Sequence, residues 1–241
     1  AHDKPITAFP AFVLRRFELD EISYNTKSGI ESPADLKGRR VGLRSYTFTP
    51  GVWTRGILSD AYGVDSSQVT WVLYGDEHVE EYKAPDNVIP ASEGSDMVAD
   101  LLSGKIDAAI RPGEVDSPDI KPLIANADEA AQDYFLQTGV YPISHAIVVK
   151  NELIESHPWL ADELYSLFKA GKEQYLQHLN TANNLDPADQ AMSRMKQIIG
   201  ADPIPYGFEA NRKSLQAFMN FNVQQGIISE PFKWEDIFLP V

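Results

Sequence analysis

The sequence predicts an α/β fold built on a parallel sheet. Short apolar runs that suit strands alternate with segments of helical character over residues 39–112, which is the pattern of repeated strand–helix units. Glycine and proline stand at the ends of these segments and punctuate them. After about residue 151 the chain is mostly helical, so the strands of the sheet are expected in the first two thirds.

Local signals give the elements of the first part. Ser32 followed by Pro33 is a helix start signal, and Gly63 is placed where a helix should stop. The segment from Asp76 to Glu81 is acidic and is expected to be a solvated loop. In order, we expect an edge strand or extended loop at 6–13, a short strand at 21–25, a helical turn at 32–38, a buried strand at 39–43, a helix at 49–62, a strand at 68–75, a helix at 95–104 and a strand at 105–112.

The second part is predicted to contain one strand and four helices. Pro158 and Pro187 each stand at a helix start. Apolar residues recur at helical spacing after Pro158, at Trp159, Leu160, Leu164, Leu167 and Phe168. The expected elements are a helix at 128–137, an apolar strand at 142–151, and helices that begin at Pro158, Pro187 and Glu209.

Composition narrows the functional class. The chain has 241 residues, 43% of them hydrophobic, which suits one large domain or two lobes. Its formal net charge is −14, so nucleic acid is not an expected partner. No apolar run approaches the roughly 20 residues that span a bilayer. The absence of cysteine excludes thiolate catalysis, disulfides and Cys–zinc sites.

Cofactor motifs are absent from the sequence. The five histidines are scattered, and no H-x-x-x-H or carboxylate cluster has metal-ligand spacing. There is no G-x-G-x-x-G, P-loop or G-x-S-x-G motif. We therefore expect no metal and no cofactor. The oligomeric state, including a homo-oligomer, is left open.

Several motifs resemble a known family. "SPADLKGRRVGL", "LLSGKIDAAI" and a strand followed by "HPW" are similar to type II periplasmic binding proteins. Within that superfamily, "TPGVWTRGIL", "YFLQTGVYPISHAIVV" and "HPWLADELYSLF" resemble the 4,5-dihydroxyphthalate decarboxylase family. The resemblance covers about Pro5 to Lys172, and W-x-R-G and T-G-x-x-P-x-x-H are its most specific elements. It implies two α/β lobes joined by two crossing strands, with the ligand in the interlobe cleft.

The resemblance also implies a division of the chain. Residues 1–26 are expected to be a remnant of lobe 1 with the first hinge strand, at 21–25, and residues 27–142 a complete lobe 2. Residues 143–241 would then supply the second hinge strand and a helical return to lobe 1. Two opening strand–helix units of lobe 1, on the order of 60–90 residues, are expected to precede Ala1.

The implied ligand site lies where the strand at 39–43 meets the helix at 49–62. In open α/β sheets, ligands bind beyond the carboxyl ends of strands. Free N–H groups at a helix N-terminus bind anions. An aromatic dicarboxylate would suit this junction, and a small anionic aromatic or carboxylate ligand is therefore the expected partner.

Five residues of this junction are candidates for ligand binding. Arg44 would supply a positive charge, Thr47 and Thr49 would supply hydroxyl donors, and Tyr46 and Trp53 would face an aromatic ring. The alternative is structural: Thr49 only caps the helix, Trp53 packs in the core and Arg44 is solvated.

Two further arginines are candidates. Arg55 belongs to W-x-R-G and either faces the cleft or pairs with a carboxylate inside the lobe. Arg111 follows another strand at its carboxyl end. Glu114 and Asp116 could instead hold Arg111 in a surface ion pair that contributes little.

His145, in T-G-x-x-P-x-x-H, is the candidate catalytic residue. Histidine donates and accepts protons near neutral pH, although a lone histidine on an apolar strand is commonly structural. The resemblance implies a carboxy-lyase that converts 4,5-dihydroxyphthalate to protocatechuate and CO₂. The alternative is a non-catalytic solute-binding protein of the ABC-transporter type for a small carboxylate. The enzyme would be cytoplasmic, and a signal peptide before residue 1 would instead indicate the periplasm.

Overall fold

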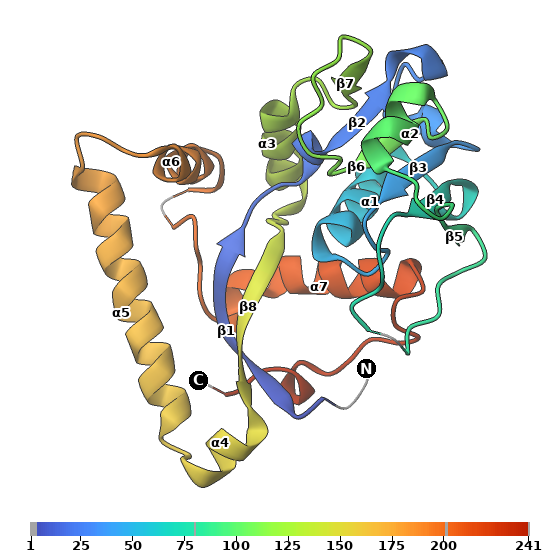
Figure 1. Cartoon of the computed structure of the whole chain (residues 1–241). Helices are drawn as coiled ribbons and strands as arrows, with labels where there is room; N and C mark the ends of the chain where they lie inside the picture. Colours follow the sequence, from blue (N-terminus) through green and yellow to red (C-terminus); the bar gives the residue numbers. More distant parts are fainter. Residues whose placement is uncertain (1–3, 80, 201, 241) are drawn as a thin grey trace. The chain divides into compact units, whose positions relative to one another are not determined.

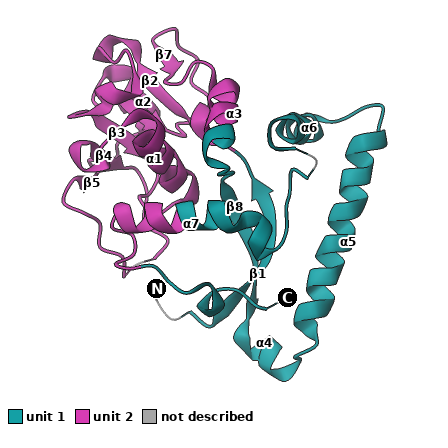
Figure 2. Ribbon diagram, turned by 180° about the vertical axis from the view of Figure 1, so that it is seen from behind, with its two compact units in different colours: residues 1–16, 135–217, 231–241 teal, residues 17–134, 218–230 magenta. Residues whose placement is uncertain are grey.

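The computed structural model of the chain describes residues 4–79, 81–200 and 202–240. The chain forms two compact units (Figure 2). Unit 1 comprises Ala1–Arg16, Phe135–Ala217 and Pro231–Val241, and unit 2 comprises Phe17–Tyr134 and Phe218–Glu230. Each unit is therefore assembled from segments that are distant in the sequence.

Unit 2 is an α/β unit with a six-stranded sheet (Figure 1). The strand order is β5-β4-β3-β6-β2-β7, and β5, β4, β3 and β6 run parallel, whereas β2 is antiparallel to both of its neighbours. Its elements are β2 (Ile22–Asn25), β3 (Arg40–Leu43), α1 (Thr49–Tyr62), β4 (Thr70–Leu73), β5 (Val88–Pro90), α2 (Met97–Ser103), β6 (Ala108–Ile110) and β7 (Ile120–Pro122). The parallel α/β class predicted from sequence is confirmed in this unit.

The local signals that predicted β3 and α1 operate as expected. Ser32 and Asp35 form a reciprocal capping box around a short 3-10 turn, Pro33–Leu36, that leads into β3. Helix α1 then ends at Gly63, which has a φ of 67° and donates its N–H to Ser59 at 3.1 Å. That left-handed conformation is one that glycine adopts without steric cost.

Unit 1 contains a two-stranded antiparallel sheet and most of the helical second half. Strand β1 (Ile6–Arg15) pairs with β8 (Ile143–Lys150), with Ile6 opposite Lys150 and Arg15 opposite Ile143. The helices are α4 (Asn151–Ser156), α5 (Leu160–Thr181), α6 (Pro187–Ile199) and α7 (Phe208–Gln224), and the last residues of α7 belong to unit 2. Helix α3 (Ala127–Thr138) likewise contributes residues to both units.

A buried arginine organises the interior of unit 1. Arg15 is only 3% exposed, and its guanidinium donates to the carbonyl oxygens of Tyr141 and Pro142 and to the side chains of Asn211 and Ser214. The Tyr141 hydroxyl donates to the Arg15 carbonyl at 3.2 Å. These bonds join the end of β1 to the segment before β8 and to α7.

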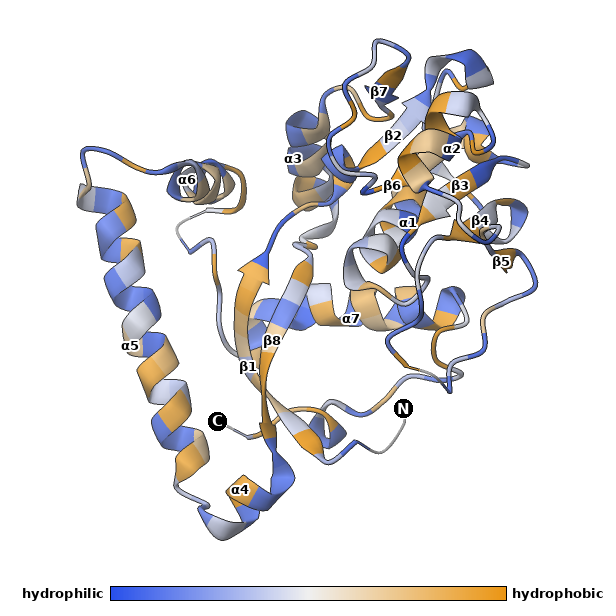
Figure 3. Cartoon of the chain, viewed as in Figure 1, coloured by the Kyte–Doolittle hydropathy of each residue, from blue (hydrophilic) through white to orange (hydrophobic). Residues whose placement is uncertain are grey.

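The long helix α5 is amphipathic. Its residues alternate between hydrophobic and hydrophilic along its length (Figure 3). Leu164 and Phe168 pack against a core cluster that contains Phe9 and Val149, while Leu167 remains 59% exposed. The predicted apolar stripe is therefore buried only in part, since Leu164 and Phe168 pack on the core, whereas Leu167 and Trp159, the latter 62% exposed, face outward.

The structure differs from the sequence prediction at several elements. The strand at 22–25, expected to be the first crossing strand, lies inside the six-stranded sheet because β6 and β7 pair with both of its edges; the partner of β8 is β1. Strands β5 and β7, only three residues each, and the short helix α4 were not predicted. Helix α2 is capped by Asp96 rather than Ser95, and α5 begins at Leu160, two residues after Pro158.

Candidate functional site

The parallel strands of unit 2 end at one edge of the sheet, which we call the carboxyl edge. Strands β3, β4 and β6 are neighbours with Leu43 level with Leu73 and Gly42 level with Ala109. The segments that follow these strands therefore emerge side by side. They carry Arg44–Thr49, the turn after β4 at residues 74–79, and Arg111. This is the edge at which open α/β sheets bind ligands.

A carboxylate is bound by the segment between β3 and α1. The backbone N–H of Tyr46 donates to Oε1 of Glu77 at 2.5 Å, and the N–H of Thr47 donates to Oε2 at 3.1 Å. The Thr47 hydroxyl also donates to Oε2. We call these three donors the carboxylate seat. In this structure the acceptor at the junction is a side chain of the same chain, and ligand binding at the junction stays a prediction.

Arg55 lies directly behind the carboxylate seat. It is 2% exposed, and its Nη2 donates to the carbonyl oxygen of Tyr46 at 2.6 Å. That carbonyl belongs to the same peptide unit as the Thr47 N–H that donates to Glu77. A cation at one end of a peptide unit polarises it and strengthens the hydrogen bond at the other end. Arg55 therefore polarises one donor of the seat and makes no hydrogen bond to Glu77 itself.

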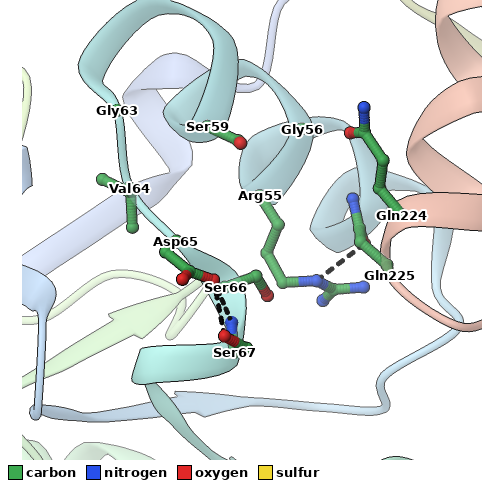
Figure 4. A pocket seen from close by; sticks show the side chains of 10 residues that line it. All are labelled: Arg55, Gly56, Ser59, Gly63, Val64, Asp65, Ser66, Ser67, Gln224 and Gln225. Atoms are coloured by element: carbon green, nitrogen blue, oxygen red, sulfur yellow. Dashed lines mark hydrogen bonds between the residues drawn. The ribbon is translucent and has the colours of Figure 1, made fainter.

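The side chain of Arg55 is fixed by its surroundings. Its Nε donates to Oε1 of Gln225 at 2.8 Å, and Gln225 donates in turn to the carbonyl of Val52 at 2.9 Å. Figure 4 shows the bond to Gln225 beside a pocket of about 300 Å³. Burial lowers the pKa of Arg55 to about 10, so the guanidinium is still charged at neutral pH. The pocket is lined by Arg55, Gly56, Ser59, Gly63, Val64, Asp65, Ser66, Ser67, Gln224 and Gln225.

Tyrosine rings surround this buried cation. The guanidinium of Arg55 lies 3.9 Å from the centroid of the Tyr46 ring, within cation–π range. The ring of Tyr82 stacks on Tyr46 with centroids 6.4 Å apart and planes 10° from parallel. The Tyr82 hydroxyl is buried and bonds to no described residue, and burial raises its pKa. Tyr46, expected to face a ligand ring, instead offers its ring to Arg55 and Tyr82 and its N–H to the seat.

The two other arginines stand at the carboxyl edge with different surroundings. Arg44 is exposed and makes no hydrogen bond or ion pair with another described residue. The Nε of Arg111 lies 3.3 Å from Oε2 of Glu21, so its partner is neither Glu114 nor Asp116. Arg111 also has a φ of 55°, a left-handed conformation that is uncommon for a residue with a side chain and that recurs at functional sites.

Trp53 and Thr49 differ from the positions expected of them. Trp53 is fully buried and stacks on Phe218 at a centroid distance of 5.1 Å, with Phe221 edge-on at 5.7 Å; its ring is therefore part of the core and offers no surface to a ligand. Thr49 is the first residue of α1, and the N-cap position belongs to Phe48, which makes no side-chain cap. Thr49 is therefore not the cap that the alternative interpretation required.

His145 lies in unit 1, whereas the other seven candidates lie in unit 2. It sits on β8 opposite Leu14, and its side chain is exposed. Its imidazole makes no hydrogen bond with another described residue. An exposed imidazole that is not used in packing can exchange protons with other molecules, so its role as a proton donor stays a prediction.

Three residues of this region were missed at the level of sequence: Glu77, Tyr82 and Gln225. Glu77 was assigned to a solvated acidic loop, yet the rule that selected Arg44–Thr49 also applies to it, because it follows the carboxyl end of the neighbouring strand. No sequence signal links Gln225 to Arg55, since 170 positions separate them. Among the residues that the structure describes, no group of three or more His, Asp or Glu could hold a metal ion.

The fold and this edge define a class: α/β proteins of the type II periplasmic-binding-protein-like fold. Residues 1–88 match the family model described as NMT1/THI5 like, which is of this type. A crystal structure of the desulfurization enzyme DSZB superposes with a TM-score of 0.52 at 14% identity, covering 98% of this chain and 77% of the other. This likeness concerns the fold alone.

Two curated relatives identify the family. A 4,5-dihydroxyphthalate decarboxylase from Comamonas testosteroni is 30% identical over 256 aligned residues, covering 100% of this chain and 78% of its own length. One from Pseudomonas putida is 35% identical over 147 residues, covering 56% of this chain and 57% of its own length. The chain belongs to the 4,5-dihydroxyphthalate decarboxylase family. No helix in the described part of the chain is both long and apolar enough to cross a bilayer.

Proposed function

We propose that this protein is a non-oxidative decarboxylase of an aromatic dicarboxylate, converting 4,5-dihydroxyphthalate to protocatechuate and CO₂. The observation that carries the proposal is the carboxylate seat: three donors at the carboxyl edge of unit 2 hold a carboxylate group. Membership of the decarboxylase family supplies the reaction class.

The seat would hold the carboxylate that stays on the ring. Hydrogen bonds to an ionised acceptor are short and about twice as strong as neutral ones, so the Tyr46 and Thr47 donors can fix the position of the ring. Arg44 and Arg111, at the same edge, would add positive charge near the second carboxylate. Binding energy from the retained carboxylate then orients the one that leaves.

The chemistry requires one proton and releases one CO₂. Protonation of the ring carbon that carries the departing carboxylate places positive charge on the hydroxyl oxygen para to it. The carbon–carbon bond then breaks, its electron pair returns to the ring, and the hydroxyl oxygen becomes neutral again. The proposed donor of the proton is His145, because an imidazolium can supply a proton near neutral pH.

A turnover assay tests the proposal. The full chain is incubated with 4,5-dihydroxyphthalate, and CO₂ release and protocatechuate formation are both measured. The two products should appear in equal amounts. Thr47→Val removes one of the three seat donors at nearly constant volume. In the Glu77→Ala background, where no side chain of the chain accepts from these donors, we expect Thr47→Val to lower kcat/KM roughly tenfold or more, as for a lost hydrogen bond to a charged group.

The matched control is Thr70→Val, the same substitution at the start of β4, at the opposite edge of the sheet. In the same Glu77→Ala background, Thr70→Val should leave kcat/KM within about twofold of the parent variant. Equal losses in both variants, or no CO₂ from the wild-type chain, would reject the proposed function.

The second candidate is a solute-binding protein for a small carboxylate. The seat is compatible with it, because both functions require a bound carboxylate; the decarboxylase relatives favour the enzyme. Tight binding of a carboxylate without turnover would select it, and a periplasmic location of the protein in the cell would agree. The decarboxylase corresponds to a cytoplasmic protein that turns over its ligand.

A further inference from the structure

Glu77 uses the carboxylate seat completely. Its two carboxylate oxygens receive all three donors, from Tyr46 and Thr47. A ligand carboxylate that binds these donors needs the same positions. The seat therefore cannot hold Glu77 and a ligand carboxylate at the same time.

The segment that carries Glu77 is held mainly by this contact. Gly75, Asp76 and His78 are exposed, and the backbone of residues 75–78 makes no hydrogen bond with the backbone of another described residue. On either side the chain contacts the sheet unit, since Tyr74 donates its N–H to the Leu43 carbonyl at 3.0 Å and the ring of Tyr82 stacks on that of Tyr46. Release of the Glu77 side chain would thus free a short loop without breaking the sheet.

The groups behind the seat favour a bound carboxylate, whether it belongs to Glu77 or to a ligand. The buried guanidinium of Arg55 is coupled electrostatically to Glu77, and a buried cation gains from a nearby negative charge. The buried hydroxyl of Ser45, next to Tyr46, makes no hydrogen bond to a described residue. If a ligand carboxylate replaces Glu77, the charge beside Arg55 and the number of accepted hydrogen bonds are both conserved, so the exchange has little electrostatic cost.

We propose that Glu77 is an internal competitor for the carboxylate seat: it occupies the seat in the absence of ligand, and an aromatic carboxylate binds by displacing it. The proposal rests on the proposed function in that the displacing group is a substrate carboxylate. It makes Glu77 a determinant of both affinity and specificity. A ligand without a carboxylate cannot replace the hydrogen bonds and the charge that Glu77 supplies, and so does not displace Glu77 from the three donors.

Titration calorimetry of the full chain with phthalate tests the competition without depending on turnover. The apparent dissociation constant equals the intrinsic one divided by the fraction of molecules with a free seat. If Glu77 fills the seat in about nine molecules of ten, Glu77→Ala should bind phthalate roughly tenfold more tightly than wild type. Asp76→Ala, which removes the same charge from the neighbouring exposed residue, should change the affinity by less than about twofold.

Glu77→Gln is a second test that still applies if Glu77→Ala does not fold. It keeps the shape of the side chain and one hydrogen-bond acceptor but removes the charge. It should also bind phthalate more tightly than wild type, by a smaller factor than Glu77→Ala. Affinities of both variants equal to or weaker than wild type, with unchanged circular dichroism, would overturn the proposal and make Glu77 a structural tie. An equal gain in Asp76→Ala would also overturn it, since the effect would then be general charge.

This outcome is separable from that of the proposed function. Tighter phthalate binding by Glu77→Ala together with no CO₂ release from wild type would reject the decarboxylase and retain the competitor. CO₂ release from wild type, with no gain in phthalate affinity for Glu77→Ala, would retain the decarboxylase and reject the competitor.

Discussion

The guanidinium of Arg55 and the carbonyl of Tyr46 form a 2.6 Å hydrogen bond inside unit 2, one peptide unit away from the carboxylate that the chain binds. Family-matched Arg55 was expected either to face the ligand or to pair with a carboxylate of its own lobe. Its hydrogen-bond acceptors are the neutral oxygens of Tyr46 and Gln225, and it forms no ion pair with a carboxylate of the described residues. The buried charge therefore acts through the backbone.

Replacement of Arg55 should lower the stability of the protein. Arg55→Met leaves the Tyr46 carbonyl and the Gln225 oxygen without their donor, and we expect the free energy of unfolding to fall by about 2–4 kcal/mol. Arg55→Lys keeps the charge but cannot donate to both oxygens, and should recover part of that loss. Urea unfolding of both variants measures these differences.

The same two variants test the positioning role. If Arg55 acts by polarising the peptide of the seat, KM should rise in the order Arg55, Arg55→Lys, Arg55→Met when measured in the Glu77→Ala background, where the substrate has no internal competitor, while kcat of the folded enzyme changes little. A purely structural role would lower stability and leave KM unchanged. A fall in kcat at constant KM would contradict the assignment as well.

Two helical glycines should respond oppositely to the same substitution. A Cβ on Gly56, in α1, would lie 2.1 Å from Cδ2 of Phe221, and an inserted methyl group in a packed core costs about 1–3 kcal/mol. Gly171 lies in α5 with nothing within 4 Å of such a Cβ, so alanine should stabilise there by up to about 1 kcal/mol through helix propensity. Midpoints of urea unfolding for Gly56→Ala and Gly171→Ala check this. A loss at Gly171 or a gain at Gly56 would show that the packing around these helices is described wrongly.

The sequence predicted the carboxyl edge but not the contents of the seat. Strand ends, helix starts and the Gly63 stop are local signals, so Arg44–Thr49 could be placed between a strand and a helix from the residues alone. The partner Glu77 lies about 30 residues further along, and its contact depends on the lateral pairing of β3 with β4. Pairing order is a property of the whole sheet and is not encoded in local periodicity.

Burial separates the candidates that the sequence could not rank. Arg44 precedes α1 and Arg55 lies in its middle; both are arginines, and the packing around them leaves the first exposed and the second only 2% exposed. A tryptophan such as Trp53 can stack on a ligand ring or pack in a core. Its contacts with Phe218 and Phe221 place it in the core. These aromatic partners are contributed by α7, more than 160 residues away, where no local pattern identifies them.

Tyr141 should make the stability of unit 1 sensitive to alkaline pH. Burial raises its pKa to about 12, an effect that the charge of Arg15 partly offsets. In the unfolded chain the phenol ionises near pH 10, so between about pH 10 and 12 the folded state holds a proton that the unfolded state has lost. The stability contributed by this proton is complete below pH 10 and falls by about 1.4 kcal/mol per pH unit above it.

Tyr141→Phe isolates this contribution. At pH 8 the variant should be about 1 kcal/mol less stable than wild type, because it lacks the 3.2 Å bond to the Arg15 carbonyl. At pH 11 the wild-type chain has lost about 1.4 kcal/mol from Tyr141, so the two proteins should be equally stable or reversed in order. A difference that stays constant between pH 8 and 11 in urea unfolding would show that Tyr141 does not titrate as described.

His145 tests the proposed proton transfer. Its side chain is exposed on β8 and makes no hydrogen bond with another described residue, so His145→Gln should leave the melting temperature nearly unchanged. If the imidazole delivers the proton to the ring carbon, kcat for CO₂ release should fall about 100-fold or more, in the range of general acid catalysis, while KM changes little. The matched control is His157→Gln. This histidine is exposed, its Nδ1 lies 3.0 Å from the Ser156 hydroxyl, and its ring is roughly perpendicular to that of Trp159; the variant should keep wild-type kcat. Added imidazole should restore part of the activity of His145→Ala, because a free imidazole can occupy the space of the missing ring and donate the proton. A His145→Gln variant with kcat within twofold of wild type would transfer the proton-donor role to another group.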